Sequence, residues 1–160
     1  MITAYLVGDR ELIAKLSSLM GGGIQRNVVR EVTRLAIALD RRVKQKLSGE
    51  VLNVRTGVLR ASTNYKVTQS QTEVIATEGT NVKYARFHEY GVPHSWEIRP
   101  RSARALAFEV GGQTIFRMRV THPPLPERSF LRSALHEMEP QIKADLERAV
   151  GLAFLEVMDR

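Results

Sequence analysis

The stretch that decides the fold covers residues 24–47 and reads IQRNVVREVTRLAIALDRRVKQKL. Its apolar residues recur at steps of three and four positions, which is the spacing of one face of an α-helix. Ser48-Gly49 follows as a stop signal, because glycine readily takes the left-handed conformation at a helix end. We therefore predict one amphipathic helix of about six turns. Its apolar positions are Ile24, Val28, Val32, Leu35, Leu39, Val43 and Leu47, and the basic positions mostly on the other face are Arg26, Arg30, Arg34, Arg41 and Lys44.

A second apolar stripe lies near the C-terminus and starts at about Ser129. Pro140 interrupts it and removes one intrahelical hydrogen bond, so we expect a kink or a break at that residue. The stripe consists of Phe130, Ala134, Leu135, Met138, Ile142, Leu146, Val150 and Phe154. Because both stripes share the helical period, we expect one core to join the two helices to a sheet face. We expect this core to contain Leu35, Leu39, Val43, Phe130, Leu135, Ile142 and Leu146.

The segments between the two stripes alternate in the manner of strands. Gly111-Gly112 supplies a two-residue hairpin turn between the last two of them. The order of helix, strands and helix predicts an α+β fold, with an antiparallel sheet of about four to five strands packed against both long helices. At 160 residues the chain is predicted to form a single domain. The predicted strands are residues 62–68, 73–77, 96–98, 105–110 and 114–120, and residues 2–7 are compatible with another.

The sequence also predicts two shorter helices and two long loops. Residues 82–90 predict a short helix that ends at Gly91, and residues 10–19 predict another with Asp9 as its N-cap, broken by Gly21-Gly22-Gly23. The loops at 50–61 and 92–104 exceed ordinary connection lengths, and such loops often carry partner contacts.

Composition excludes several classes of function. The chain has no cysteine, which excludes disulfides, thiolate catalysis and cysteine-ligated zinc. No run approaches the ~20 apolar residues that a membrane-spanning helix needs, so no membrane partner is expected. The N-terminal residues 1–9 are too short and lack the basic start of a signal peptide, which predicts synthesis in the cytoplasm.

The formal net charge of +7 is unevenly distributed. Residues 1–60 carry eleven Lys and Arg against five Asp and Glu, whereas residues 121–160 carry five against seven. Three interpretations stay open at this point. The charges can belong to solvated helix faces, to a surface that attracts nucleic acid, or to complementary ends that meet between neighbouring subunits of a ring.

The candidate chemistry is sparse. His88-Glu89 begins like a zinc-protease motif, but position 92 is Val, so one helix face cannot present two imidazoles. His88 and His94 could still converge with Glu89, as in some nucleases, and the competing interpretation is a packing cluster whose polar tips are hydrogen-bonded. No paired carboxylates suited to acid–base catalysis occur in the middle of the chain. We therefore predict no enzymatic activity, no cofactor and no metal.

A loop marked by Pro100 carries three guanidinium groups, on Arg99, Arg101 and Arg104. A guanidinium group can bind a phosphate or a partner's carboxylate through two parallel hydrogen bonds. The competing interpretation is an ordinary solvated loop.

Three short motifs, in this order and spacing, resemble those of the tail-completion proteins of long-tailed bacteriophages, which are also described as neck or minor tail proteins. The first lies in Arg55–Ser62, the second in Gly79–Gly91 and the third in Pro124–Leu135. The pattern spans roughly residues 24–155, and residues 1–23 have no assigned role in it. Ser129 and Ser133 stand where such proteins frequently have proline, which leaves the helix entry less rigid. The motif positions are Thr56, Gly57, Leu59, Tyr84, Ala85, Glu89, Gly91, Phe130 and Leu131.

This resemblance implies a structural protein of the virion neck or tail top, without catalysis or cofactor. Such proteins form rings, often six- or twelve-fold, that complete the tail and join it to the head. The implied partners are further copies of the chain and the adjacent tail-terminator or connector proteins, with possible non-specific contact to packaged DNA. The expected partner interface comprises Arg26, Arg30, Arg34, Arg41, Arg99, Arg101 and Arg104.

Two rival functions stay open. The first is a DNA-binding or nuclease-like protein that uses the basic helix and the cluster of His88 and His94. The second is a component of a phage-derived injection or gene-transfer particle, which would obey the same physical constraints as the phage protein.

Overall fold

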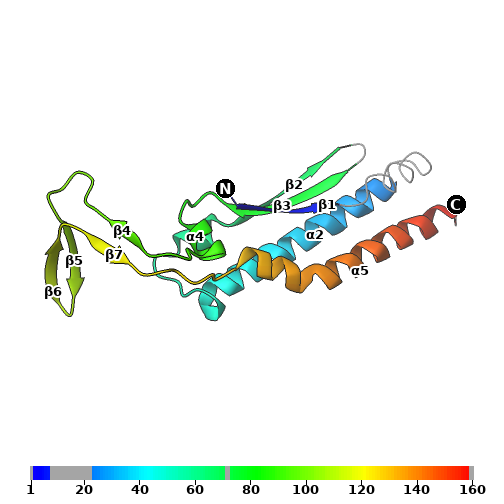
Figure 1. The fold of residues 1–160 in the computed structure, drawn as a ribbon. Coiled ribbons are helices and arrows are strands. Elements are labelled where there is room, and N and C mark those ends of the chain that lie inside the picture. Colours follow the sequence, from blue (N-terminus) through cyan, green and yellow to red (C-terminus); the bar gives the residue numbers. More distant parts are fainter. Residues whose placement is uncertain (1, 8–22, 71–72, 159–160) are drawn as a thin grey trace.

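A computed structural model describes residues 2–7, 23–70 and 73–158 of the chain. The helix expected over residues 10–19, its cap Asp9 and the glycines at 21–22 lie outside these described residues. Two long helices and a three-stranded sheet form a body, and a narrow arm extends from one end of it (Figure 1). The mixed α+β class predicted from the sequence is confirmed.

The first long helix, α2, spans Gly23–Gln45 and confirms the prediction from its apolar spacing. A π-helical turn, η1 (Lys46–Glu50), follows it and ends the regular helix at Gly49, whose φ is 119°. The apolar stripe of α2 faces inward, because this packing removes its side chains from water. The buried members of the stripe are Val28, Val32, Leu35, Leu39, Val43 and, in η1, Leu47.

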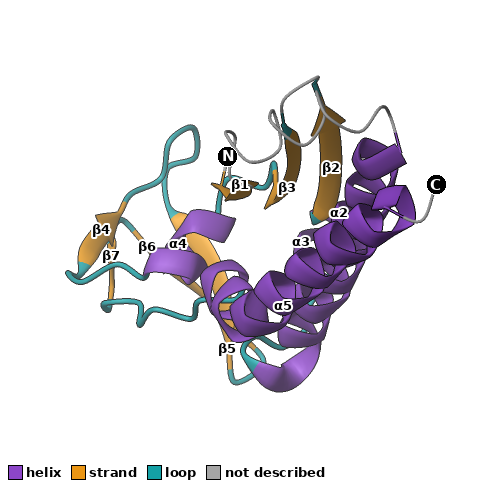
Figure 2. Cartoon of the chain, turned by 90° about the vertical axis from the view of Figure 1, so that its right-hand side faces the viewer, coloured by secondary structure: helices purple, strands orange, loops and turns teal. Residues whose placement is uncertain are grey.

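The second long helix, α5, spans Leu131–Met158 and lies alongside α2 (Figures 1 and 2). It continues through Pro140 instead of breaking there, although its orange portion changes direction in Figure 1. Of the expected core residues, Leu135 and Leu146 are only partly buried; Phe154, the last residue of the predicted stripe, has a side chain outside the description. The other members expected in the shared core are buried: Leu35, Leu39, Val43, Phe130 and Ile142.

The sheet of the body has the strand order β1-β3-β2, and every pairing is antiparallel. The side chains of β3 alternate between buried and partly buried, and α2 packs across the sheet. Residues 2–7, which had no assigned role, thus supply one edge of the sheet. The strands are β1 (Ile2–Val7), β2 (Asn64–Gln69) and β3 (Val74–Thr80).

Two short helices lie between the sheet and the arm. The first, α3, spans Val58–Ser62 within the loop expected at 50–61. The second, α4, spans Ala85–Tyr90 and ends at Gly91, as the sequence predicts.

The remaining strands do not join the sheet of the body. They form two separate antiparallel ribbons, β4 with β7 and β5 with β6, within residues 92–125, which we call the arm (Figure 1). The prolines at 93, 123 and 124 lie where the arm leaves and rejoins the body, and they lack the N–H donors that a continuous sheet would require. The strand bounds are Trp96–Ile98 for β4, Leu106–Val110 for β5, Gln113–Arg117 for β6 and Val120–His122 for β7.

The turn between β5 and β6 has the predicted form. Gly111 and Gly112 both have positive φ, 58° and 79°, as a tight turn between two right-twisted strands requires. Among the described residues, no helix is long and apolar enough to cross a membrane.

Candidate functional site

The arm is fixed to the body by a buried carboxylate. Glu89 in α4 is fully buried, and its two oxygens accept hydrogen bonds from the backbone N–H groups of Phe130 and Leu131, both at 2.9 Å, and of Arg132 at 2.8 Å. The hydroxyl of Ser129 donates a further bond at 2.8 Å. The first N–H groups of a helix have no partner within the helix, and its positive dipole end attracts anions. Glu89 therefore caps α5 from a position some forty residues earlier.

The environment of Glu89 keeps it charged. Burial alone would raise the pKa of its carboxyl, but the hydrogen bonds from the N–H groups of α5 and from the Ser129 hydroxyl lower the pKa below its usual value. A carboxylate held in this way acts as a structural group, because its lone pairs are already occupied by backbone donors.

Gly91 makes the next connection possible. Its φ is 67°, and a Cβ at this position would lie 2.7 Å from the backbone nitrogen of Glu127 and 2.8 Å from the carbonyl oxygen of Leu125. This close approach lets Val92 and Leu125 exchange backbone hydrogen bonds of 2.8 and 2.9 Å. The N–H of Arg128 also donates to the carbonyl of His88 at 2.8 Å. We call residues 88–92 and 125–132 the arm-base junction.

The family-motif positions converge on this junction. Phe130 and Leu131 of the junction are buried, as is Ala85 beside it, while Tyr84 is exposed at its surface. The first motif approaches from the other side, because Thr56, Gly57 and Leu59 line one cavity together with Tyr84 and His88. Only the resemblance singles out these residues in the sequence. Hydrogen bonds between segments forty residues apart produce no recognisable pattern of neighbouring residues.

The histidine pair of the nuclease-like alternative has a different setting. His88 is half-buried, and burial, followed by the positive charge of Arg128, lowers its pKa. In the described part of the chain its buried Nδ1 has no hydrogen-bond partner, which corrects the expectation that the polar tips of this cluster are bonded. His94 is exposed in the arm, and Glu89 is occupied by α5. No group of three or more His, Cys, Asp or Glu within the described residues is arranged to hold a metal ion.

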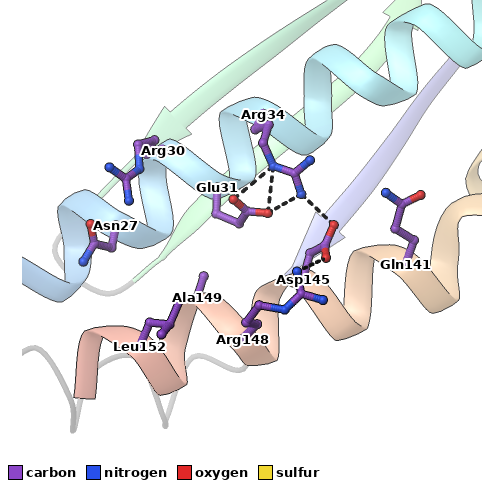
Figure 3. A pocket seen from close by; sticks show the side chains of 9 residues that line it. All are labelled: Asn27, Arg30, Glu31, Arg34, Gln141, Asp145, Arg148, Ala149 and Leu152. Carbon is purple, nitrogen blue, oxygen red and sulfur yellow. Dashed lines mark hydrogen bonds and ion pairs between the residues drawn. The ribbon is translucent and has the colours of Figure 1, made fainter. Parts of the chain in front are cut away.

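The expected interface arginines of α2 form a stripe on its exposed side. Arg34 donates to Glu31 at 2.5 Å and to Asp145 of α5 at 2.6 Å, and Arg148 also contacts Asp145 at 3.1 Å (Figure 3). These side chains line a polar cleft of about 440 Å³ between α2 and α5, together with Arg30. Within the described residues, three members of the stripe form no ion pair, namely Arg26, Arg30 and Arg41.

Part of the uneven charge is satisfied within the chain. Arg42 bonds to Glu50 at 2.6 Å and to Glu137 of α5 at 2.7 Å, and the buried ammonium of Lys46 lies 2.6 Å from Glu137. The basic front and the acidic back of the sequence therefore meet between α2 and α5 of one molecule. Pairing of these charges within one subunit was not among the interpretations that the sequence left open.

The arginines of the arm lie apart from those of α2. Arg99 pairs with its neighbour Glu97, whereas Arg101 and Arg104 form no ion pair with any described residue. The first turns of α2 lie at the end of the molecule that holds the C-terminus, and the arm extends from the opposite end (Figure 1). The structure thus divides the expected interface into two separate basic surfaces.

The arm also exposes apolar side chains that the sequence analysis missed. The exposed fractions reach 53% for Val110, 63% for Phe116 and 71% for Met118, and Ile98 and Phe108 are exposed as well. The pairing of β5 with β6 places Phe108 and Val110 on one face and Phe116 on the other. The alternating pattern predicts the strands, but it gives no indication that no other layer covers them.

No protein-family model, curated protein or solved structure matches this chain. The resemblance to phage neck proteins therefore stays a prediction based on the three motifs. In the fold, the residues of those motifs form the arm-base junction and line the cavity beside it.

Proposed function

We propose that this protein is a structural subunit of the phage neck or tail top. In this proposal it completes the tail and joins it to the head as part of an oligomeric ring of six or twelve copies. The observation that supports it best is the arm, a pair of two-stranded ribbons with uncovered apolar side chains, held at its base by Glu89 and Gly91.

The arm has the physical properties of an assembly element. A two-stranded ribbon is at best marginally stable alone in water, and it gains stability when another layer covers it. Exposed clusters of large apolar side chains mark interaction surfaces on soluble proteins. The arm-base junction sets the direction in which the arm leaves the body, so its apolar surface is presented outward. A contact between unlike surfaces of identical subunits closes into a ring when the rotation between them permits.

The basic surfaces fit contacts with neighbouring rings. Arg101 and Arg104 on the arm, and Arg26, Arg30 and Arg41 on α2, have no ion-pair partner among the described residues. They are available for carboxylates of an adjacent tail-terminator or connector protein, with bidentate geometry where a guanidinium group meets a carboxylate. A phage-derived injection or gene-transfer particle would use the same contacts.

Charge reversal in assembling particles tests this role. The variant R99E/R101E/R104E should fold normally, because all three side chains are exposed, while heads and tails accumulate unjoined. A matched control reverses three exposed basic residues of the body away from both surfaces, for example Lys66, Lys83 and Lys143, and should leave joining intact. Normal infectious particles from the arm variant would contradict the interface.

DNA contact is the second candidate function. It is favoured by the three arginines of α2 that lack partners within the described residues, since clustered positive charge attracts the phosphate backbone. In the variant R26E/R30E/R41E, this function predicts correctly joined particles that lose their DNA, whereas the assembly role predicts particles that fail to join. Salt dependence alone does not separate the two, because salt weakens attraction between exposed charges in both.

A further inference from the structure

A groove lies on the body beside the arm-base junction. Its cavity of about 620 Å³ has a floor of Leu47, Leu52 and Leu59, of which the first two are buried in the core. The exposed side chains of Arg55, Arg60 and Arg128 stand at its rim. We call this site the basic-rimmed groove.

The groove has apolar walls and unused positive charge. Val54, Val58 and Tyr84 are exposed at or beside it, so the apolar surface extends beyond the floor. The rim arginines form no ion pair with any described residue. The polar cleft of Figure 3 differs, because two of its three arginines are paired with carboxylates in the same chain. The basic-rimmed groove therefore suits an occupant that combines an apolar group with a carboxylate.

The tip of the arm has this combination. Phe116 of β6 is opposite Ala107 of β5, and Glu109 lies on the same face of the ribbon two residues further along β5. Glu109 is exposed and forms no ion pair among the described residues, unlike Glu97, the other carboxylate of the arm. The opposite face is also apolar, since Phe108 and Val110 lie there. Apolar side chains on both faces are typical of strands that become buried on both faces.

We infer that the tip of the β5–β6 ribbon of one copy docks in the basic-rimmed groove of a second copy. Phe116 enters the apolar floor, and Glu109 meets the arginines of the rim. The ribbon extends away from the body, whereas the groove lies near the base of the same arm, so the two surfaces are brought together between molecules (Figure 1). The contact joins unlike surfaces and repeats from copy to copy. This inference rests on the proposed ring and names the contact that builds it.

A charge exchange tests the contact in the full-length chain. Glu109→Arg and Arg60→Glu should each weaken self-association at least fivefold, as measured by sedimentation velocity over a concentration series. The double variant E109R/R60E should restore association to near the wild-type level, because the pair is re-formed with opposite signs. The matched control E109R/K66E has the same net charge, but Lys66 lies on β2, so association should stay weak. Failure of the double variant to recover would overturn the pairing.

Cross-linking gives a second readout that does not depend on affinity. The chain has no cysteine, so Thr114→Cys near the tip and Thr56→Cys at the groove can be introduced singly into two preparations. Mixing them under mild oxidation should give a disulfide-linked pair in far higher yield than either preparation alone. If wild-type chains associate but no mixed cross-link forms, the groove assignment fails and the ring stands. If wild-type chains never associate, with or without neck proteins, the ring fails as well.

Discussion

The carboxylate of Glu89 lies where α4, at the base of the arm, meets the start of α5. It accepts three backbone hydrogen bonds from the start of α5 and one from the hydroxyl of Ser129. Beside it, Gly91 provides the close backbone approach to Leu125 and Glu127. The shape of the arm base therefore depends on two residues, the buried and charged Glu89 and Gly91, which has no side chain.

Glu89→Gln should lower the free energy of unfolding by roughly 2–4 kcal/mol. The amide keeps the size of the side chain but replaces one acceptor oxygen with a donor that faces backbone N–H groups. Chemical denaturation measures the change, with Glu127→Gln as the control. Glu127 is exposed and pairs with Arg132, so its loss should cost about 0–1 kcal/mol. Equal effects of the two substitutions would contradict the role of Glu89.

The burial of Glu78 predicts that the folded chain loses stability as the pH rises through neutrality. This residue is buried in β3 opposite α2, and neither carboxylate oxygen has a hydrogen-bond partner among the described residues. Burial, followed by the negative charge of Asp40, raises its pKa to about 7, although Lys44 opposes the shift. Because the folded chain holds this proton more tightly than the unfolded chain, the stabilising contribution is complete below the ordinary carboxyl pKa and is lost as the pH rises through about 7.

The measurement is the difference in unfolding free energy between wild type and Glu78→Gln across pH 5–8. As the pH rises from 5 to 8, the unfolding free energy of the variant should increase by about 2–3 kcal/mol relative to that of the wild type, because only the wild type must ionise a buried acid. Burial lowers the pKa of His88, which gives its contribution the opposite sign, and comparison with the variant cancels this effect. A difference that stays constant with pH would show that Glu78 keeps its ordinary pKa.

At the scale of elements, α2 stabilises the folded chain, whereas the β5–β6 ribbon is proposed to serve self-association. Leu39 of α2 is buried in the main core, and truncation to Ala should cost ~2–5 kcal/mol of stability. A denaturation midpoint unchanged by Leu39→Ala would remove this residue from the core.

Phe116 of the ribbon is exposed, so Phe116→Ser should leave the melting temperature of the monomer within about 2 °C of the wild type. The same substitution should weaken self-association at least fivefold, because it removes the aromatic group from the interface. Light scattering over a concentration series follows the association. A large loss of monomer stability would mean that the ribbon packs on its own body.

The elements that local patterns specify could be predicted from the sequence. The spacing of apolar residues indicated α2 and α5, and Gly111-Gly112 indicated the hairpin with its correct strands. The separation of the arm from the sheet could not be predicted, because alternation identifies a strand but not the strand beside it. Pro140 was expected to kink or break the helix; α5 is continuous through it, and its orange portion changes direction in Figure 1.

The candidate site was less accessible to sequence reasoning. The motif resemblance selected Glu89, Gly91 and Phe130, but their hydrogen bonds and contacts link segments that are far apart in the chain. Arg34 was among the residues expected at an interface, whereas Arg42 and Lys46 were not. The pairing of all three with Asp145 and Glu137 depends on how α2 meets α5. The apolar side chains at the tip of the arm are exposed because no other layer of the described chain covers the ribbon, and an alternating sequence does not indicate this.

At the scale of the whole molecule, a packed body and an arm that extends away from it make the chain suited to repeated head-to-tail contacts. Ion pairs between α2 and α5 satisfy much of the charge inside one subunit, and the arm carries unsatisfied apolar surface to a distance from it. An assembly in which each arm contacts the next body would cover that surface in every copy. The proposed neck or tail-top ring is this arrangement closed upon itself.

Mass photometry of the full-length chain, alone and with its adjacent neck proteins, tests the ring most directly. We predict a discrete species of six or twelve copies, which negative-stain images should resolve as a ring. The control variant replaces residues 105–118 with a short Gly-Ser linker, which removes β5 and β6 but keeps the pairing of β4 with β7. It should remain folded and monomeric. A wild-type chain that stays monomeric under both conditions, or an armless variant that still forms rings, would contradict the account.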